Sequence, residues 1–305
     1  MHNSVIIGGQ IGTMFIILFI GMFCYYKGLI TKEGSKQLSA VELQIVNPLL
    51  IFMSYQTEYS KKLLGGLMWA FALSAVSFAV TIALSALLVR KGREDWEIER
   101  FSCIYSNCGF IGIPLINGIF GSEGVLYLTA YVTLFNLLVW THGYMLMKGE
   151  RDFSSFVKAL RSPSVIAVLL GLVCYLTGIR LPKILAGSLD YVADMNTPLA
   201  MLIAGSAAAQ TNFAGALKRS GVYLVSALKL LVIPVICFAV CRLIPAPRLV
   251  LMVVTIACAC PAATTGTMFA IQLDKKPERC SELFAVTTLL SALTLPLITM
   301  IGDNF

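Results

Sequence analysis

The stretch SNCGFIGIPLINGIFG, residues 106–121, places amides, glycines and a proline in the middle of a long apolar run. Glycine and proline are the residues least compatible with a straight helix, and an unpartnered amide is costly in hydrocarbon. Proline nevertheless suits the first turn of a helix, where its missing N–H costs nothing. We therefore predict that a half-helix begins at Pro114, after an unwound stretch at 108–113. Its first turn would present bare N–H groups and a positive dipole end, which favour an anion.

A second stretch, ACPAATTGTMFA, predicts the same device near the other end of the chain, with a half-helix beginning at Pro261. Irregular backbone at membrane depth is tolerated only where protein or a water-filled cavity covers it. Two such breaks at matching places therefore indicate a binding site near the membrane midplane. The alternative is that both prolines are plain kinks, stabilised by neighbouring hydroxyl side chains.

Lys229, in VSALKLLVIP, is the one basic residue that falls well inside an apolar run. It follows Arg219 by ten residues, or roughly 15 Å of helix, which is about half of a ~30 Å hydrocarbon core. A lysine at that depth costs about 3 kcal/mol on the lenient insertion scale. It either snorkels or meets a carbonyl cluster for structure alone, or it serves the binding site. In the second case its ammonium would lie at the carbonyl ends of the broken helices, near Asn107 and Cys258, and replace a coupling sodium.

The elements that must position these residues are membrane helices. The chain is 58% hydrophobic and only 13% charged, far from the roughly 25% charged residues of soluble domains. A membrane helix needs about 20 apolar residues. The runs of that kind predict an all-α membrane protein of ten spans, near 5–26, 38–56, 65–89, 101–119, 124–147, 163–179, 184–209, 220–243, 248–272 and 281–301.

Basic residues between the runs predict the orientation. Each connection is numbered by the apolar run that it follows. The even connections carry only Lys61, Lys62, Arg180, Lys183, Arg242 and Arg248. The odd connections carry more, namely Lys27, Lys32, Lys36, Arg90, Lys91, Arg93, Arg100, Lys148, Arg151, Lys158, Arg161, Lys218, Arg219, Lys275, Lys276 and Arg279. The positive-inside rule then places the odd connections in the cytoplasm and both termini outside the cell membrane. This bias accounts for the net charge of +7 without a nucleic-acid partner.

The chain also repeats its landmarks. Asn47 and Pro48 in the second run correspond to Asn196 and Pro198 in the seventh, and Pro114 in the fourth run corresponds to a proline in the ninth. We predict two five-helix halves, 1–150 and 151–305. Because five is odd, the second half enters the membrane from the opposite side, which is the inverted repeat of many secondary transporters.

Several polar residues within the spans have two readings. The Asn47 and Asn196 amides either satisfy carbonyls freed by the adjacent prolines or line the substrate path. Asp190 and Asp194 lie one turn apart, as vestibule carboxylates in water or as proton-carrying groups. Glu42 is expected to reach water. The cysteines have neither a disulfide framework nor a metal-binding spacing, and we expect no metal or cofactor.

At these residues the sequence resembles the auxin efflux carrier family, especially its short bacterial members. SNCGFIGIPLINGIFG is similar to the signature of the family's fourth helix, VNPLLIFM and NTPLAMLIAGS to its second and seventh helices, and ACPAATTGTMFAIQLD to its ninth. The resemblance covers nearly the whole chain, in order. One departure is the short connection at 148–162, where plant carriers have a large cytoplasmic loop.

The resemblance implies a scaffold of helices 1, 2, 6 and 7, which also forms a homodimer, and a moving transport domain of helices 3–5 and 8–10, in which helices 4 and 9 cross at their breaks. It implies transport of organic anions, such as auxin, malate or malonate, next to that crossing. The substrate-binding residues that match by position are Asn107, Gly112, Pro114, Asn117, Asn136, Pro261 and Thr264.

We therefore expect a secondary transporter of a small organic anion that works by alternating access of the elevator type. The alternatives are a sodium-coupled symporter of a bulkier organic anion and a passive anion channel. An enzyme is not expected, because the Gly-x-Ser-x-Gly and His-Glu-x-x-His motifs of hydrolases are missing from the sequence.

Overall fold

The computed structural model describes residues 2–149 and 163–303, and every regular element in this part of the chain is helical. The first half contains α1 (His2–Tyr26), α2 (Lys32–Val41), the π-turn η1 (Glu42–Val46), α3 (Asn47–Ser54), α4 (Lys61–Leu88), α5 (Trp96–Ile104), η2 (Cys108–Gly112), α6 (Ile113–Leu138), η3 (Val139–Gly143) and α7 (Tyr144–Lys148). The second half contains α9 (Pro163–Thr177), α10 (Lys183–Ala193), α11 (Asn196–Ala209), α12 (Phe213–Ala216), α13 (Ser220–Ala227), η4 (Leu228–Val232), α14 (Ile233–Cys241), α15 (Arg248–Ala259), α16 (Thr265–Gln272) and α17 (Pro277–Asp303).

Helix length and composition identify a membrane protein. Five helical stretches in the described residues are long and apolar enough to cross a bilayer, namely Lys32–Ser54, Lys61–Leu88, Cys108–Lys148, Ser220–Cys241 and Pro277–Met300. Shorter apolar helices occupy Ile11–Tyr26, Pro163–Thr177 and Arg248–Ala259. The 41-residue stretch is bent at Gly121, whose backbone angles of φ 63° and ψ −158° are not helical. Such angles are accessible to glycine at little cost.

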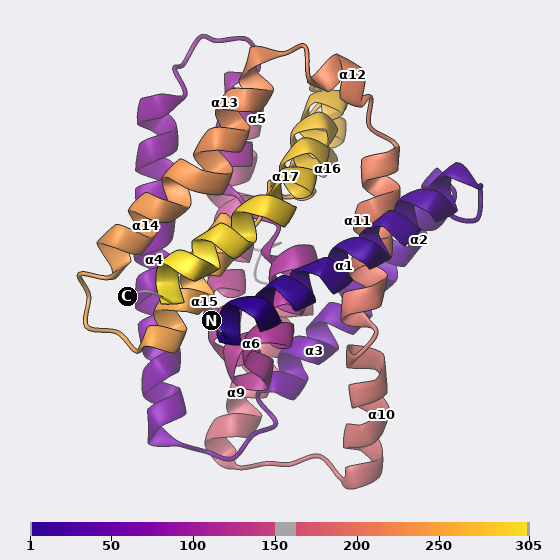
Figure 1. Cartoon of the computed structure of the whole chain (residues 1–305). Helices are drawn as coiled ribbons and strands as arrows, with labels where there is room; N and C mark the ends of the chain where they lie inside the picture. Colours follow the sequence, from indigo (N-terminus) through magenta and orange to yellow (C-terminus); the bar gives the residue numbers. More distant parts are fainter. Residues whose placement is uncertain (1, 150–162, 304–305) are drawn as a thin grey trace.

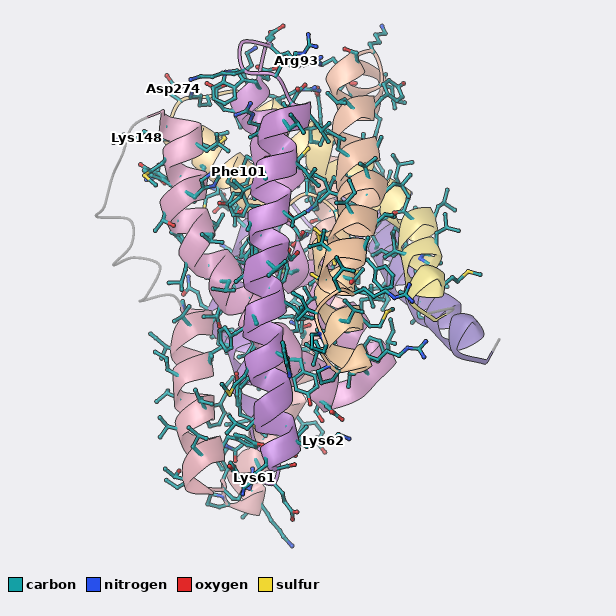
Figure 2. All side chains as sticks on the ribbon, turned by 90° about the vertical axis from the view of Figure 1, so that its left-hand side faces the viewer. Lys61, Lys62, Arg93, Phe101, Lys148 and Asp274 are labelled. Atoms are coloured by element: carbon teal, nitrogen blue, oxygen red, sulfur yellow. The ribbon has the colours of Figure 1, made fainter. Side chains whose placement is uncertain are left out.

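The ends of the helices separate the charged connections as the sequence predicts. In Figure 2, Lys61 and Lys62 lie at one end of α4, and Arg93, Lys148 and Asp274 lie at the other end. Three of the connections numbered odd, those after the third, fifth and ninth apolar runs, therefore share one end of the molecule in this view. The assignment of that end to the cytoplasm remains a prediction.

Three of the π-turns have the same local cause. Pro48, Pro114 and Pro234 each occupy one of the first two positions of the α-helix that follows η1, η2 or η4. A proline cannot donate to the carbonyl four residues earlier and clashes with it, so a wider turn relieves the strain. In each case the N–H of the preceding residue donates to the carbonyl five residues back, which is that of Glu42, Cys108 or Leu228.

Small residues allow α1 and α11 to pack with their backbones in contact, as their crossing in Figure 1 shows. A Cβ added to Gly205 would lie 1.9 Å from the Leu18 carbonyl oxygen, and one added to Gly21 would lie 2.5 Å from the Leu202 carbonyl oxygen. Glycine at such positions permits the close helix approach typical of membrane interfaces.

Further packing joins the described helices into smaller groups. One contains α3, α9 and α10, with α3 lying against the other two. Another contains α4, α6, α14 and α15, in which α4 and α15 pack against each other and against both α6 and α14. These groups are the setting for the candidate site. The ten-helix inverted repeat predicted from the sequence remains a proposal.

Candidate functional site

Two short extended segments, 105–107 and 260–263, pair with each other in the protein interior. They follow the ends of α5 and α15, and Ser106 forms an antiparallel bridge with Ala262. The Asn107 N–H donates to the Pro261 carbonyl at 2.7 Å, and the Ala263 N–H donates to the Tyr105 carbonyl at 2.9 Å. Each segment thus satisfies backbone groups of the other that no helix satisfies. We call them the paired segments.

Lys229 lies at the helix ends that lead into the paired segments. Its side chain is fully buried, with 0% exposure. Its Nζ donates to the Ser106 hydroxyl at 2.6 Å, to the Cys258 carbonyl at 3.2 Å and to the Cys103 carbonyl at 3.4 Å. The ammonium thus lies at the last carbonyls of α5 and α15, as in the second reading of the sequence, and its role in binding or coupling stays a prediction.

The electrostatics of this placement follow from the two helices. Cys103 and Cys258 are the penultimate residues of α5 and α15, so both carbonyls belong to the last turn, where the helix dipole is negative. Ser106 completes the arrangement, because its hydroxyl also donates to the Cys258 carbonyl at 3.0 Å. The ammonium therefore has three oxygen partners and two negative helix ends around it.

The helices that follow the paired segments present their positive ends. Asn107 caps η2, since its Oδ1 accepts the Phe110 N–H at 3.4 Å, while its Nδ2 is buried without a partner. Thr265, the first residue of α16, has a buried hydroxyl without a partner. The Ala262 N–H donates to the Thr287 hydroxyl at 3.1 Å. Unpartnered donors at helix N-termini are the groups that bind anions.

The predicted starts of the half-helices are wrong. The helical turns after the first interruption begin at Cys108, so 108–113 is not unwound and Pro114 lies inside the helix. The second begins at Thr265, and Pro261 is a buried extended residue whose carbonyl accepts the Asn107 N–H. A proline lies near each interruption, but neither proline is the residue at which the next helix begins. The π-turn η2 accommodates Pro114 within the helix, and the bridge to Ser106 holds 261–263 extended.

Of the other predicted site residues, two lie beside the paired segments and two lie on α6. Gly112 lies against the second interruption, because a Cβ there would be 3.3 Å from the Cys260 sulfur. Thr264 is half-buried in the turn before α16. Asn117 and Asn136 are half-buried on α6, and Asn136 Nδ2 donates to the Val132 carbonyl of its own helix at 2.9 Å. Neither amide forms a hydrogen bond to the paired segments within the described residues.

A second polar group lies where α11 meets η1. Glu42 is fully buried, which corrects the expectation that it reaches water. Its Oε1 accepts the Asn196 Nδ2 at 2.6 Å. Asn47 is buried beside η2, with Nδ2 3.4 Å from the position of a Cβ on Gly109. Asp190, like Asp194, is exposed.

A third group closes one end of the molecule. Arg279 is 3% exposed and pairs with Glu282 at 3.2 Å, Glu99 at 3.5 Å and Asp95 at 3.7 Å. These residues tie α5 to α17. Hydrogen bonds to Asp95 and Glu94 raise the pKa of the neighbouring exposed Lys276 above its ordinary value. A polar cavity of about 580 Å³ adjoins the cluster, lined in part by Arg93, Lys218 and Arg219.

Sequence reasoning missed four participants, namely Ser106, Thr265, Glu42 and the Arg279 cluster. Of these, Ser106 stands next to Asn107 and Thr265 next to Thr264, both of which the sequence singled out. No group of three or more His, Cys, Asp or Glu side chains in the described part of the chain is arranged to hold a metal ion.

The long apolar helices, with buried paired segments between them, are those of a multi-pass membrane protein. The sequence profile of the family described as "Membrane transport protein" matches residues 7–299. The chain belongs to this family, which is that of the auxin efflux carriers, and the resemblance read from the sequence is confirmed. It is a family of membrane transporters and not of enzymes.

Two archaeal relatives agree with this assignment. An uncharacterised transporter of Methanothermobacter thermautotrophicus is 26% identical over 295 residues, which cover 93% of this chain and 95% of the relative. An uncharacterised transporter of Methanocaldococcus jannaschii is 25% identical over 204 residues, covering 62% of this chain and 65% of the relative. The likeness thus extends over nearly the full length of both chains in the first case.

Proposed function

We propose that the protein is a secondary transporter that moves a small organic anion, a mono- or dicarboxylate such as malate, malonate or an auxin-like acid, across the cell membrane. The single observation that carries the proposal is the contact of the Lys229 ammonium with the carbonyls of Cys103 and Cys258. A fixed positive charge at the centre of two interrupted helices draws an anion to the same place.

Lys229 also bears on the coupling ion. The carbonyl ends of interrupted helices are where carriers of this architecture coordinate sodium. An ammonium that already donates to both carbonyls and to the Ser106 hydroxyl fills that coordination permanently. We therefore favour a carrier that needs no sodium over the alternative of a sodium-coupled symporter of a bulkier anion.

The anion would bind at the positive side of the paired segments. There the buried Asn107 Nδ2 and the Thr265 hydroxyl are unpartnered; Asn107 caps η2, and Thr265 is the first residue of α16. Amides and hydroxyls bind a carboxylate without the strong ion pair that would trap it. We expect Asn117 and Asn136 to contribute from α6, and Pro261, Gly112 and Thr264 to shape the site.

Motion of the elevator type suits the packing. Where α1 and α11 meet η2, α6 and α17, an apolar cavity of about 10 Å³ remains, lined in part by Leu18, Ile111 and Met201. Such a volume holds about one water. An anion could enter only if the helices separate along this boundary. In the numbering of the ten predicted spans, spans 1, 2, 6 and 7 would then form the dimerised scaffold, and spans 3–5 and 8–10 would form the moving part. A passive anion channel would instead need a continuous opening.

The test is transport by the purified protein in proteoliposomes. Radiolabelled malonate, malate and indole-3-acetate would be offered with and without sodium, after preloading with the same unlabelled anion. Accumulation by counterflow, independent of sodium, is expected for at least one anion. Flux that only equilibrates the label supports the channel, and strict sodium dependence supports the symporter. Alanine at Asn107 or Asn136 should weaken the affinity for the transported anion while the fold is retained.

A further inference from the structure

Glu42 is the unusual residue of the second polar group. It lies in η1, within the apolar stretch Lys32–Ser54, and its exposure is 0%. Its neighbours Val41 and Leu43 are 42% and 43% exposed, so the π-turn directs the carboxyl group inward while the apolar side chains face outward. A carboxylate buried without a countercharge is very costly, whereas the neutral acid is not.

No cation offsets the charge of Glu42 in the described part of the chain. The elements packed against η1 are α2, α3, α9 and α11. Their titratable residues are Lys32, Glu33 and Lys36 on α2, which are exposed, and Cys174 and Tyr175 on α9, of which Tyr175 donates its hydroxyl to the Ser60 carbonyl. None of them forms an ion pair or hydrogen bond with Glu42.

The hydrogen bonding of Glu42 and Asn196 is incomplete by one proton. Oε1 accepts the Asn196 amide at 2.6 Å, but Glu42 Oε2 and Asn196 Oδ1 are both buried acceptors without a donor. A proton on Oε2 would make it a donor to Asn196 Oδ1, while the amide still donates to Oε1. One proton therefore satisfies both orphaned atoms, in the cyclic pair that a carboxylic acid and a primary amide form.

The pair lies next to the candidate site. Asn196 begins α11, which packs against both η1 and η2, and Asn47, just after η1, approaches Gly109 in η2. A negative charge on Glu42 would repel an anion at η2 across a medium of low dielectric constant. Binding of the anion therefore favours the protonated acid, and protonation favours the anion to the same degree, because linkage is reciprocal.

From this arrangement we propose that Glu42 is a proton-binding site, held neutral by Asn196, and that its proton is taken up together with the transported anion. The coupling part of this proposal rests on the function proposed above. The carboxylate gains one proton and becomes the acid, without any other reactant. Proton and anion then move in the same direction, so an acidic compartment drives uptake from that side.

The first test needs no substrate. Infrared difference spectra of the full-length protein in lipid nanodiscs would be recorded as the pH is raised. Wild type should show the C=O band of a protonated carboxylic acid at neutral pH, downshifted in D₂O. Glu42→Gln should lose it, and the control Glu33→Gln, at an exposed position on the adjoining helix, should keep it. An unchanged band in Glu42→Gln, or no band in wild type, overturns the proposal.

A second variant covers the case in which Glu42→Gln does not fold. Asn196→Leu keeps the acid and removes its partner, so the C=O band should move to higher frequency. A band at the wild-type frequency would mean that Asn196 does not hold the acid, and would contradict the proposal.

The coupling is tested with radiolabelled malonate in proteoliposomes. An inward acid gradient should stimulate wild-type uptake several-fold, and Glu42→Gln should retain counterflow but lose this stimulation. Equal stimulation of both proteins overturns the proposed coupling. If malonate is not transported by wild type under any gradient, the choice of substrate is wrong, and the infrared experiment still decides the protonation of Glu42.

Discussion

The Lys229 ammonium lies 2.6 Å from the hydroxyl of Ser106, a residue 123 positions away in the sequence. Ser106 also bridges Ala262 through the backbone, so one serine connects the lysine to both paired segments. This relationship makes Lys229 part of the framework of the site and places its charge where two helices end. Changes at this centre should therefore affect transport more than insertion or folding.

Pro114→Ala tests the role of the π-turn η2. Alanine restores an N–H that can donate to the Phe110 carbonyl, so the widened turn should revert to a regular α-helix. The reversion rotates Cys108–Gly112 relative to α6 and displaces the Asn107 cap. We expect membrane insertion and helix content to be unchanged and transport to fall at least tenfold, as measured by counterflow and circular dichroism. Wild-type rates would mean that the π-turn is irrelevant to the site.

Arg279→Met should destabilise the protein strongly. The guanidinium is the most buried cation that pairs with Glu282, Glu99 and Asp95. Each carboxylate has one further basic partner, which is more exposed, namely Arg219, Arg93 or Lys276. Removal of Arg279 therefore breaks three ion pairs at the buried centre of the cluster, and breaking a buried pair costs about 3–5 kcal/mol. The matched control is Lys36→Met, which removes an exposed pair with Glu33 at 3.7 Å and should cost less than about 1 kcal/mol. Thermal unfolding in detergent measures both, and equal melting temperatures would refute the assignment of the Arg279 cluster.

Gly205→Ala tests the contact between α1 and α11. The new methyl group would overlap the Leu18 carbonyl, which is backbone and cannot rotate away. Overpacking of this kind costs about 1–3 kcal/mol. Gly187→Ala is the control, because nothing lies within 4 Å of a Cβ there. A lower melting temperature is expected for the first variant alone, and an unaffected Gly205→Ala would mean that the two helices pack differently.

The sequence was informative where a residue is costly unless something specific surrounds it. Lys229 is costly at mid-membrane, and its depth together with the expected helix breaks indicated carbonyl partners, with snorkelling as the alternative. The prolines predicted interruptions but misplaced the helix starts, because a π-turn keeps the chain helical up to Pro114, and because the bridge between Ser106 and Ala262 is a tertiary contact. Glu42 was assigned to water because distance along a helix does not reveal which way a π-turn directs a side chain.

Apolar runs predicted membrane helices, yet the partners of each helix depend on packing that no single sequence displays. Arg279 is an example, since its carboxylate partners Asp95 and Glu99 lie far away in the chain. Asn136 is another, because the sequence does not show that its amide donates to its own helix, and its role in binding stays a prediction.

The central claim is that Lys229 is a built-in cation that takes the place of a coupling sodium in an anion transporter. Its most direct test is uptake of the radiolabelled anion identified by the counterflow panel, in proteoliposomes containing wild type or Lys229→Met, with and without sodium. We predict sodium-independent uptake by wild type, and in the variant either loss of uptake or uptake that requires sodium, with folding retained. Normal uptake by Lys229→Met without sodium would contradict the account.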